Sequence, residues 1–153
     1  SRDRIGGSAR SRPRAWGSWF REYRPIYTPL EAGIEHYLRF DHDFIGREAV
    51  EAEGSGDGPA RRLVYLQVDP DPNEPADVIG DEPIWHGAEV VGWVTSGAWA
   101  HYSERSLALG YVPAGLAGAD ADGDFEVEII GRRRPAQLLH EPVLDPKGER
   151  MRA

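Results

Sequence analysis

Alternation of apolar and polar residues marks most of the chain after residue 60. Short runs rich in Val, Ile, Leu and aromatic residues are separated there by clusters of Gly, Pro and Asp. A period of two built from β-branched and aromatic residues is typical of strands that bury one face. The pattern predicts about six strands, over residues 61–68, 83–86, 89–95, 105–112, 125–129 and 133–139. Short strands of this number favour a closed Greek-key-like barrel over an open sheet with free edges.

The predicted strand over residues 105–112 has two unlike faces. In its run SLALGY, two Leu and a Tyr alternate with Ser, Ala and Gly. A face of such small residues lets another backbone approach closely, as in a tight barrel wall. The preceding residues 95–102, TSGAWAHY, are rich in hydroxyl groups and aromatic rings, and we predict that they form a loop. Gly87, at the first of two turn positions, predicts a type II′ hairpin that joins residues 83–86 to 89–95.

Residues 14–53 show a mixed pattern. Thr28, Pro29 and Glu31 have the spacing of a helix start with a capping box. The run IEHYLRF at 34–40 alternates well enough to predict a strand, and residues 46–53 predict a short helix. The expected fold is therefore mainly β, with a short α+β segment at the N-terminus.

The remaining stretches are predicted to lie outside packed structure. Residues 1–13 are Arg-rich with no periodicity, which predicts a flexible basic arm. Residues 54–60, GSGDGPA, are predicted to be a linker because they cannot build a core. Residues 146–153 form the expected tail.

Composition excludes several classes of function. The chain of 153 residues has no Cys and only five His, which argues against a metal cluster and excludes a thiolate nucleophile. The net charge is −8; residues 1–24 contribute +5 and the rest −13. An acidic body is a poor general binder of nucleic acid. No apolar run approaches the roughly 20 residues of a membrane span, and no signal peptide is visible, so we expect a cytoplasmic protein.

Two pairs of motifs resemble one superfamily. Gly92-x-x-Thr95-Ser96-Gly97, followed by SLALGYVP at 106–113, resembles the C-terminal barrel of the aminomethyltransferase (glycine cleavage T-protein) superfamily. That superfamily includes the folate-linked regions of dimethylglycine and sarcosine dehydrogenases. TPLEAG at 28–33 and DFIGREA at 43–49 resemble the end of its folate-binding domain. The resemblance implies that residues 14–53 end a folate-binding domain and that residues 61–145 form the barrel.

The resemblance also implies a cofactor and a partner. The cofactor is tetrahydrofolate, with FAD only on a partner chain. The catalytic aspartate of the superfamily and much of its pterin cradle lie upstream of the resembling region, so we assign no catalytic residue and expect the chain alone to be inactive. The implied partner is a protein chain that supplies the N-terminal half of the folate domain, and possibly a flavin domain. Related dehydrogenases have a Glu soon after a RAWG run, where this chain has Ser18-Trp19-Phe20.

Candidate ligand-binding residues lie in the resembling segments. Hydroxyls and a Gly at the TSG motif could line the mouth of a site, or could form a turn held by hydroxyl-to-backbone bonds. A guanidinium suits a planar or carboxylate partner, and an indole can stack on a flat ligand. A lone loop His is more often a surface or interface residue. The candidate cofactor-binding residues are Trp16, Glu31, Arg39, Thr95, Ser96, Gly97, Trp99 and His101.

Three functions fit these observations to different degrees. The first is the C-terminal part of a tetrahydrofolate-dependent one-carbon transfer enzyme, possibly of an amine-demethylating dehydrogenase. The alternative is a non-catalytic assembly module that docks a partner chain through the barrel and the Arg-rich arm. A hydrolase has little support, because Ser96 has only His101 nearby in sequence and no carboxylate at a fixed spacing. The run Arg132–Arg134 is either a solvated strand end or a recognition site for polyglutamate.

Overall fold

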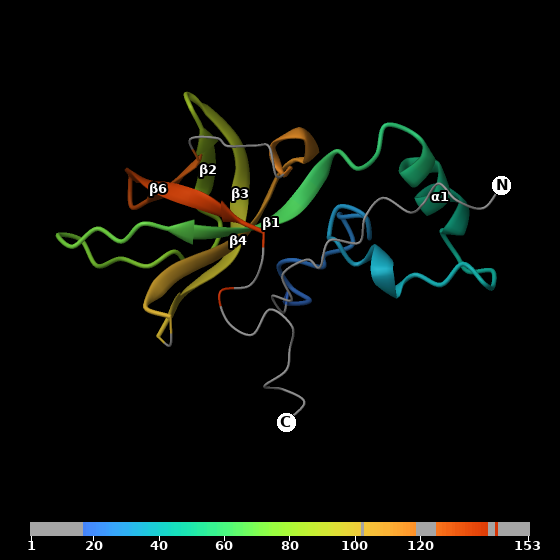
Figure 1. Cartoon of the computed structure of the whole chain (residues 1–153), viewed down its shortest axis with the longest axis horizontal. Helices are drawn as coiled ribbons and strands as arrows, with labels where there is room; N and C mark the ends of the chain where they lie inside the picture. Colours follow the sequence, from blue (N-terminus) through green and yellow to red (C-terminus); the bar gives the residue numbers. More distant parts are fainter. Residues whose placement is uncertain (1–16, 102, 119–124, 141–142, 144–153) are drawn as a thin grey trace.

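The computed structural model describes residues 17–101, 103–118, 125–140 and 143. Figure 1 shows a β-barrel at one end and a short helix at the other, with the segment of residues 17–33 between them. We call residues 17–33 the N-terminal segment. The predicted arm at 1–13, the tail at 146–153 and the candidate Trp16 lie outside the described residues.

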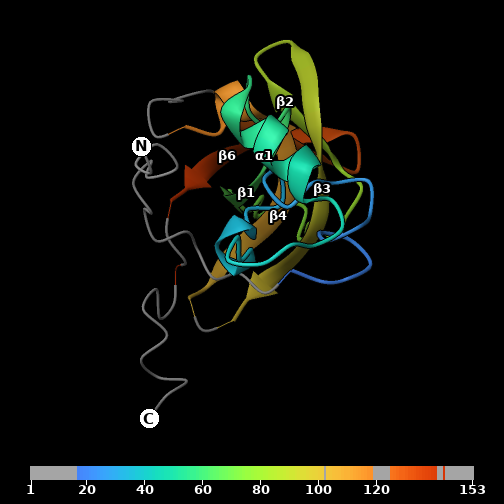
Figure 2. The same ribbon diagram turned by 90° about the vertical axis from the view of Figure 1, so that its right-hand side faces the viewer.

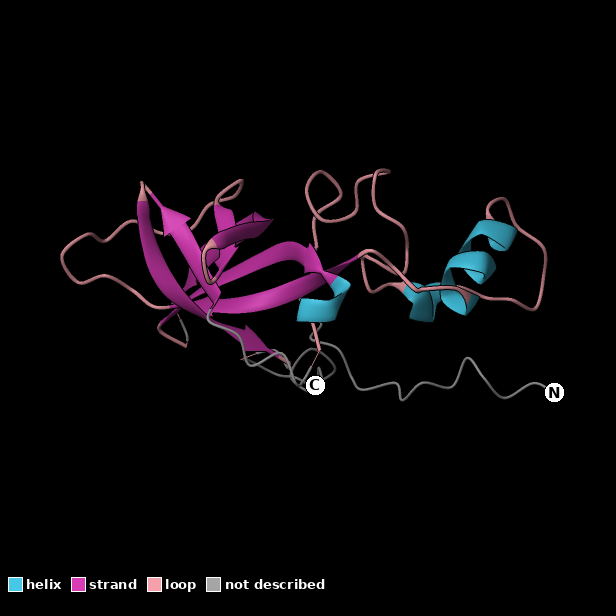
Figure 3. Cartoon of the chain, turned by 90° about the horizontal axis from the view of Figure 1, so that it is seen from above, coloured by secondary structure: helices cyan, strands magenta, loops and turns pink. Residues whose placement is uncertain are grey.

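Six antiparallel strands close into the barrel. Strand β1 pairs with both β4 and β6, so the sheet order β1-β4-β3-β2-β5-β6 returns to its start. Figure 3 shows the strands wrapped around one another. The strands are β1 (Arg61–Val68), β2 (Pro83–His86), β3 (Glu89–Ala100), β4 (Arg105–Pro113), β5 (Phe125–Ile129) and β6 (Arg132–Leu139). The prediction of a mainly β chain with a six-stranded barrel is confirmed.

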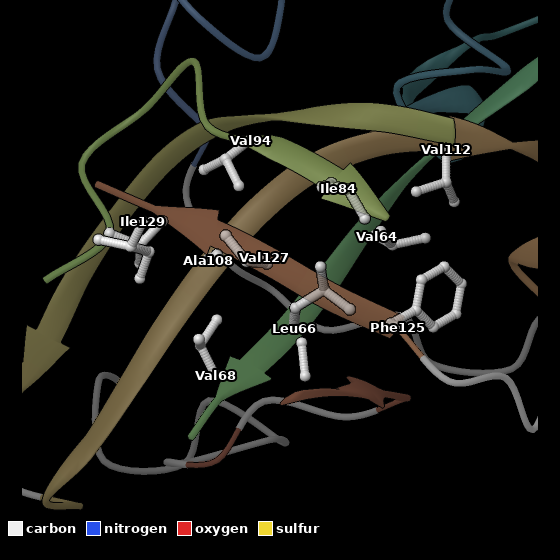
Figure 4. Close-up of a cluster of buried hydrophobic side chains, with 12 residues drawn as sticks. Val64, Leu66, Val68, Ile84, Val94, Ala108, Val112, Phe125, Val127 and Ile129 are labelled. Atoms are coloured by element: carbon white, nitrogen blue, oxygen red, sulfur yellow. The ribbon is translucent and has the colours of Figure 1, made fainter. Parts of the chain in front are cut away.

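Aliphatic side chains from the strands fill the barrel (Figure 4). Leu66, Ile84 and Val127 are fully buried there. The small residues of β4, Ser106, Ala108 and Gly110, are buried, and the close approach of another backbone predicted for this face is confirmed. A Cβ added at Gly110 would lie 2.6 Å from Ile84 Cδ1 and 2.7 Å from the Trp93 carbonyl oxygen. The absence of a side chain at Gly110 therefore lets β2 and β3 approach β4.

The prediction of a loop over residues 95–102 is wrong for most of its length. Strand β3 continues to Ala100 and pairs with β4 from Ser96 opposite Leu109 to Ala100 opposite Arg105. The register shifts between Val94 and Ser96, which makes a β-bulge at Thr95. Gly97, Ala98 and Ala100 have low β propensity, but the partner strand supplies the ladder that overrides it.

The capping box forms without a regular helix behind it. The Glu31 carboxylate accepts the Thr28 N–H at 3.2 Å, and the Thr28 hydroxyl accepts the Glu31 N–H at 3.1 Å. One helical turn follows and ends at Gly33, whose φ is +73°. The Ile34 N–H then donates to the Pro29 carbonyl and the Gly33 N–H to the Leu30 carbonyl, which is the Schellman arrangement.

Residues 34–40 do not form the predicted strand. Residues Glu35–Tyr37 form the 3₁₀ helix η1, and a second one, η2, covers Ala114–Leu116. Alternation alone cannot hold a strand that has no neighbouring strand to pair with. The predicted helix is confirmed as α1 (Arg47–Ser55), which extends two residues into the predicted linker. Helix α1 buries no residue. Figure 2 shows it in front of the barrel, and Figure 1 shows it apart from the strands.

The basic run on β6 has protein partners for all three side chains, although Arg132 and Arg133 are exposed to solvent. Arg134 is buried and donates to the carbonyls of Ala76 and Glu74, at 2.7 and 2.8 Å. The Arg133 guanidinium lies 3.4 Å from the ring centroid of Trp85. Arg132 forms an ion pair of 3.0 Å with the Glu74 carboxylate. The run therefore holds the long connection between β1 and β2 against the barrel.

Candidate functional site

A buried carboxylate joins the N-terminal segment to the outer face of β3 and β4. Glu22 has no exposed surface. Its Oε1 accepts the Ser96 hydroxyl at 2.6 Å, and its Oε2 accepts the Ser18 N–H. Its carbonyl oxygen accepts the Tyr111 hydroxyl at 2.7 Å. Burial of a carboxylate is costly unless its oxygens are hydrogen-bonded, so these contacts hold the segment in one position.

Aromatic rings pack beside this carboxylate. Tyr27 stacks on Tyr111 with a centroid separation of 3.8 Å, and the Trp93 ring lies 6.4 Å from Tyr27. The Trp93 indole N–H donates to the Tyr27 hydroxyl at 3.0 Å. Arg21 donates to the Thr95 carbonyl at 3.1 Å, an oxygen that lies in the β-bulge of β3. The segment therefore covers the outer faces of β3 and β4 with a continuous set of contacts.

An open hollow of about 320 Å³ lies at this junction. Its walls come from the N-terminal segment, from β3 and from the loop before β2. The lining residues are Phe20, Arg21, Arg24, Tyr27, Asp81, Trp93 and Thr95. Aromatic faces and charged groups thus meet at one open concave surface.

The TSG residues lie at this junction, although their side chains already have partners. The Thr95 hydroxyl donates to the Leu109 carbonyl at 3.2 Å, and the Ser96 hydroxyl donates to Glu22. A Cβ at Gly97 would lie 2.4 Å from Val78 Cγ1, so Gly97 permits close approach of the loop before β2. These three residues shape the wall behind the hollow, and their binding of a cofactor stays a prediction.

The other candidates do not gather with them. Arg39 is exposed and forms an ion pair of 3.6 Å with Asp41. His101 is exposed in the turn after β3, and Trp99 lies on β3 opposite Ser106. Glu31 is buried, and its Oε1 lies 3.9 Å from the Arg61 guanidinium, in addition to the capping contact. Glu31 therefore has a structural partner at each carboxylate oxygen, and the binding roles of all four residues stay predictions.

Sequence reasoning missed Glu22, Arg24, Tyr27 and Trp93. One signal was available for Glu22, since an acidic residue is expected soon after the RAWG run and Glu22 lies five residues after Gly17. The other three carry no motif of their own. Their convergence depends on how the N-terminal segment crosses the barrel, which pairwise spacing in the sequence does not reveal.

Burial of Tyr111 raises the pKa of its phenol far above the usual range, and the nearby Tyr27 and Glu31 add to the effect. Because the folded-state pKa is raised, this group's contribution to stability is present below about pH 10, the unfolded value, and falls as the pH rises further. Tyr111→Phe should cost about 1–2 kcal/mol at pH 7, since the Glu22 carbonyl loses its donor. It should also flatten the loss of stability above pH 10.

Urea unfolding of this variant between pH 7 and pH 11 measures both effects. Tyr37→Phe is the control, because the Tyr37 side chain is 75% exposed. An equal alkaline slope in Tyr111→Phe and the unchanged chain would contradict the account.

The barrel, its bulged β3 and the TSG–GYVP pairing across β3 and β4 define a known class of domain. The family model for the glycine cleavage T-protein C-terminal barrel domain matches residues 61–145. The chain belongs to this family. The resemblance inferred from the two pairs of motifs is thereby confirmed.

Curated relatives extend the match beyond the barrel. The chain is 38% identical over 133 residues to the mitochondrial dimethylglycine dehydrogenase of Mus musculus, covering 86% of this chain and 14% of that protein. It is 39% identical over 117 residues to the aminomethyltransferase of Parasynechococcus marenigrum (strain WH8102), covering 75% and 30%. It is 34% identical over 131 residues to the 4-methylaminobutanoate oxidase (formaldehyde-forming) of Paenarthrobacter nicotinovorans, covering 84% and 15%. The chain spans 14–30% of the length of these relatives.

A solved structure shares the fold. The glycine cleavage system aminomethyltransferase T from Bartonella henselae matches with a TM-score of 0.60 at 20% identity, over 80% of this chain and 33% of that chain. In the described part of the chain, no three His, Asp or Glu side chains are grouped so as to hold a metal ion. No helix among the described residues is long and apolar enough to cross a bilayer.

Proposed function

We propose that this chain is the C-terminal part of a tetrahydrofolate-dependent one-carbon transfer enzyme. Residues 14–53 would be the end of its folate-binding domain, and residues 61–145 its barrel. Two relatives, dimethylglycine dehydrogenase and 4-methylaminobutanoate oxidase, are named for substrates that are N-methyl amines. The substrate class we propose is therefore an N-methyl or aminomethyl amine.

One observation supports the proposal more than any other. The Glu22–Ser96 contact joins the segment that leads into TPLEAG to the strand that contains TSG. The two blocks that resemble the superfamily are thereby held together as one surface. Such a surface can position one wall of a cofactor site, and positioning is a main source of rate in group transfer.

The fit of tetrahydrofolate can be judged from the chemistry of the junction. The cofactor combines flat rings with a glutamate tail, which require aromatic faces and cationic groups. The hollow offers Phe20, Tyr27 and Trp93 together with Arg21 and Arg24. These residues fit part of the cofactor, whereas the catalytic aspartate and much of the pterin cradle would come from upstream sequence. FAD would belong to a partner domain or chain.

A second candidate is a non-catalytic module that docks a partner chain. It is favoured by apolar surface on the connection between the N-terminal segment and α1. The side chain of Tyr37 is 75% exposed, Ile45 is fully exposed, and α1 buries no residue. A partner polypeptide that packed against Tyr37, Ile45 and α1 would bury this exposed surface.

A domain-replacement chimera distinguishes the two functions. Residues 17–145 of this chain would replace the matching region of the Parasynechococcus marenigrum aminomethyltransferase. Calorimetric titration with tetrahydrofolate should then show binding, and Glu22→Gln should weaken it while Glu48→Gln, on the exposed face of α1, should not. A folded chimera that binds no tetrahydrofolate would refute the folate function and favour the docking module.

A further inference from the structure

The hollow at the junction has a charge opposite to that of the chain. Arg21 and Arg24 line it together with Asp81, so its formal lining charge is +1. The whole chain has a net charge of −8. A cationic recess concentrates small anions locally, whereas the acidic surface around it repels the acidic remainder of a larger partner.

The two arginines differ in how they are engaged. Arg21 donates to the Thr95 carbonyl at 3.1 Å and lies 3.7 Å from the Asp81 carboxylate. This pairing offsets the one negative charge in the lining. The Arg24 carbonyl accepts the Tyr27 N–H at 3.0 Å, but within the described part of the chain no hydrogen bond or ion pair engages the Arg24 side chain. Its guanidinium is therefore available to an anion from solution.

Aromatic rings form the rest of the wall. Phe20 is 85% exposed, which is unusual for a ring that lines a concave surface. Trp93 is held by its indole hydrogen bond to Tyr27, and Tyr27 is held by its stack on Tyr111. Two of the three rings are thus fixed before any ligand arrives, which lowers the entropic cost of binding a flat molecule.

We propose that this hollow binds a small aromatic carboxylate, with its ring against Phe20 and Trp93 and its carboxylate on Arg24. Planar guanidinium groups recognise carboxylates through paired hydrogen bonds, and an aromatic ring covers apolar surface that is otherwise wet. A hollow of about 320 Å³ that is open to solvent has room for a substituted ring.

This inference deepens the proposed function in one respect. If the protein uses folate, the ligand class includes the aminobenzoyl-glutamate part of that cofactor. The hollow would then select the middle and tail of the molecule, leaving the pterin for the upstream domain. The same chemistry also fits a free aromatic acid, so the two sources must be separated by experiment.

The test uses the full 153-residue chain and three probes. These are 4-aminobenzoyl-L-glutamate, 4-aminobenzamide, which lacks a carboxylate, and L-glutamate, which lacks a ring. Binding is followed by the NMR signal of the Trp93 indole N–H, which lies in the hollow wall. Only the first probe should shift that signal saturably, because each of the others lacks one half of the recognised chemistry.

Two variants locate the site. Arg24→Gln should weaken binding of 4-aminobenzoyl-L-glutamate about tenfold or more, since a hydrogen bond to a charged group is lost. Arg39→Gln is the matched control: Arg39 is also exposed, but it pairs with Asp41 away from the hollow. Absence of a saturable shift, or equal affinity in Arg24→Gln and the unchanged chain, would overturn the proposal.

The chimera and the Arg24→Gln variant together distinguish a failure of the hollow proposal from a failure of the folate function. If the chimera binds tetrahydrofolate with unchanged affinity after Arg24→Gln, the folate function stands and the hollow is not part of it. If 4-aminobenzoyl-L-glutamate binds through Arg24 but the chimera binds no tetrahydrofolate, the hollow serves a free aromatic acid.

Discussion

Gly92→Ala is expected to destabilise the protein by about 3 kcal/mol or more, the upper range for overpacking a close-packed interior. A Cβ at this position would lie 1.9 Å from the Tyr111 carbonyl oxygen and 3.3 Å from Val112 Cα. Both atoms belong to the backbone of β4, so no side-chain rotation relieves the clash. Strands β3 and β4 would have to separate. Because Tyr111 lies on β4, its contacts with Tyr27 and Glu22 of the N-terminal segment would be disturbed as well.

Urea unfolding followed by Trp fluorescence measures this effect. Gly115→Ala is the matched control, because nothing lies within 4 Å of a Cβ added there. It should change stability by less than about 1 kcal/mol, in either direction. Equal unfolding midpoints for the two variants would show that β3 and β4 do not approach as described.

Glu22→Ala is expected to cost about 2–4 kcal/mol, because it leaves buried donors without an acceptor and opens a cavity. Ser96 and Ser18 would both lose their partner. Glu22→Gln should cost less, about 1–2 kcal/mol, since it keeps the volume and one acceptor oxygen. The loss should also displace the N-terminal segment and open the hollow.

Exposed Glu48 on α1 provides matched controls, because neither Glu48→Ala nor Glu48→Gln removes a buried contact. These variants should stay within about 0.5 kcal/mol of the unchanged chain. The position of the segment can be read separately from the near-ultraviolet circular dichroism of Trp93 and Tyr27. A Glu22→Ala protein with unchanged stability and unchanged aromatic signal would refute the role given to this carboxylate.

The barrel could be predicted from sequence because its information is local. Strands β1 and β5 have the predicted bounds, since alternation and flanking turn residues mark both of their ends. The hairpin between β2 and β3 also follows from one residue, Gly87, whose φ is +60° and which lies between the paired His86 and Glu89. Period-two patterns and tight turns need only a few neighbouring residues to be recognised.

The parts that failed depend on partners distant in sequence. Residues 96–100 have weak strand propensity, but β4 supplies their ladder. Residues 34–40 have better alternation and no strand to pair with, so they form turns and η1. In both cases the presence of a neighbouring strand decided the outcome, and local propensity did not.

The candidate site was predictable only in part, for the same reason. The TSG motif lies in the part of β3 that the N-terminal segment contacts. The contact that organises the region joins Glu22 to Ser96, 74 residues apart. Arg39 was proposed from its place in a segment that resembles the folate-binding domain and from the chemistry of its guanidinium, and the structure places it in an exposed ion pair with Asp41. The available guanidinium is Arg24, which no motif distinguishes from the other arginines near the N-terminus.

Native-state hydrogen exchange tests most directly whether the N-terminal segment and the barrel form one unit, on which the junction and its hollow depend. The Ala32 N–H donates to the Thr28 carbonyl, and the Leu63 N–H of β1 donates to the Glu31 carbonyl. Both amides should exchange with the same free energy as the amides of β4, and Glu22→Ala should lower all of them together. Rapid exchange of Ala32 by a local opening, with the β4 amides unaffected by Glu22→Ala, would contradict this account.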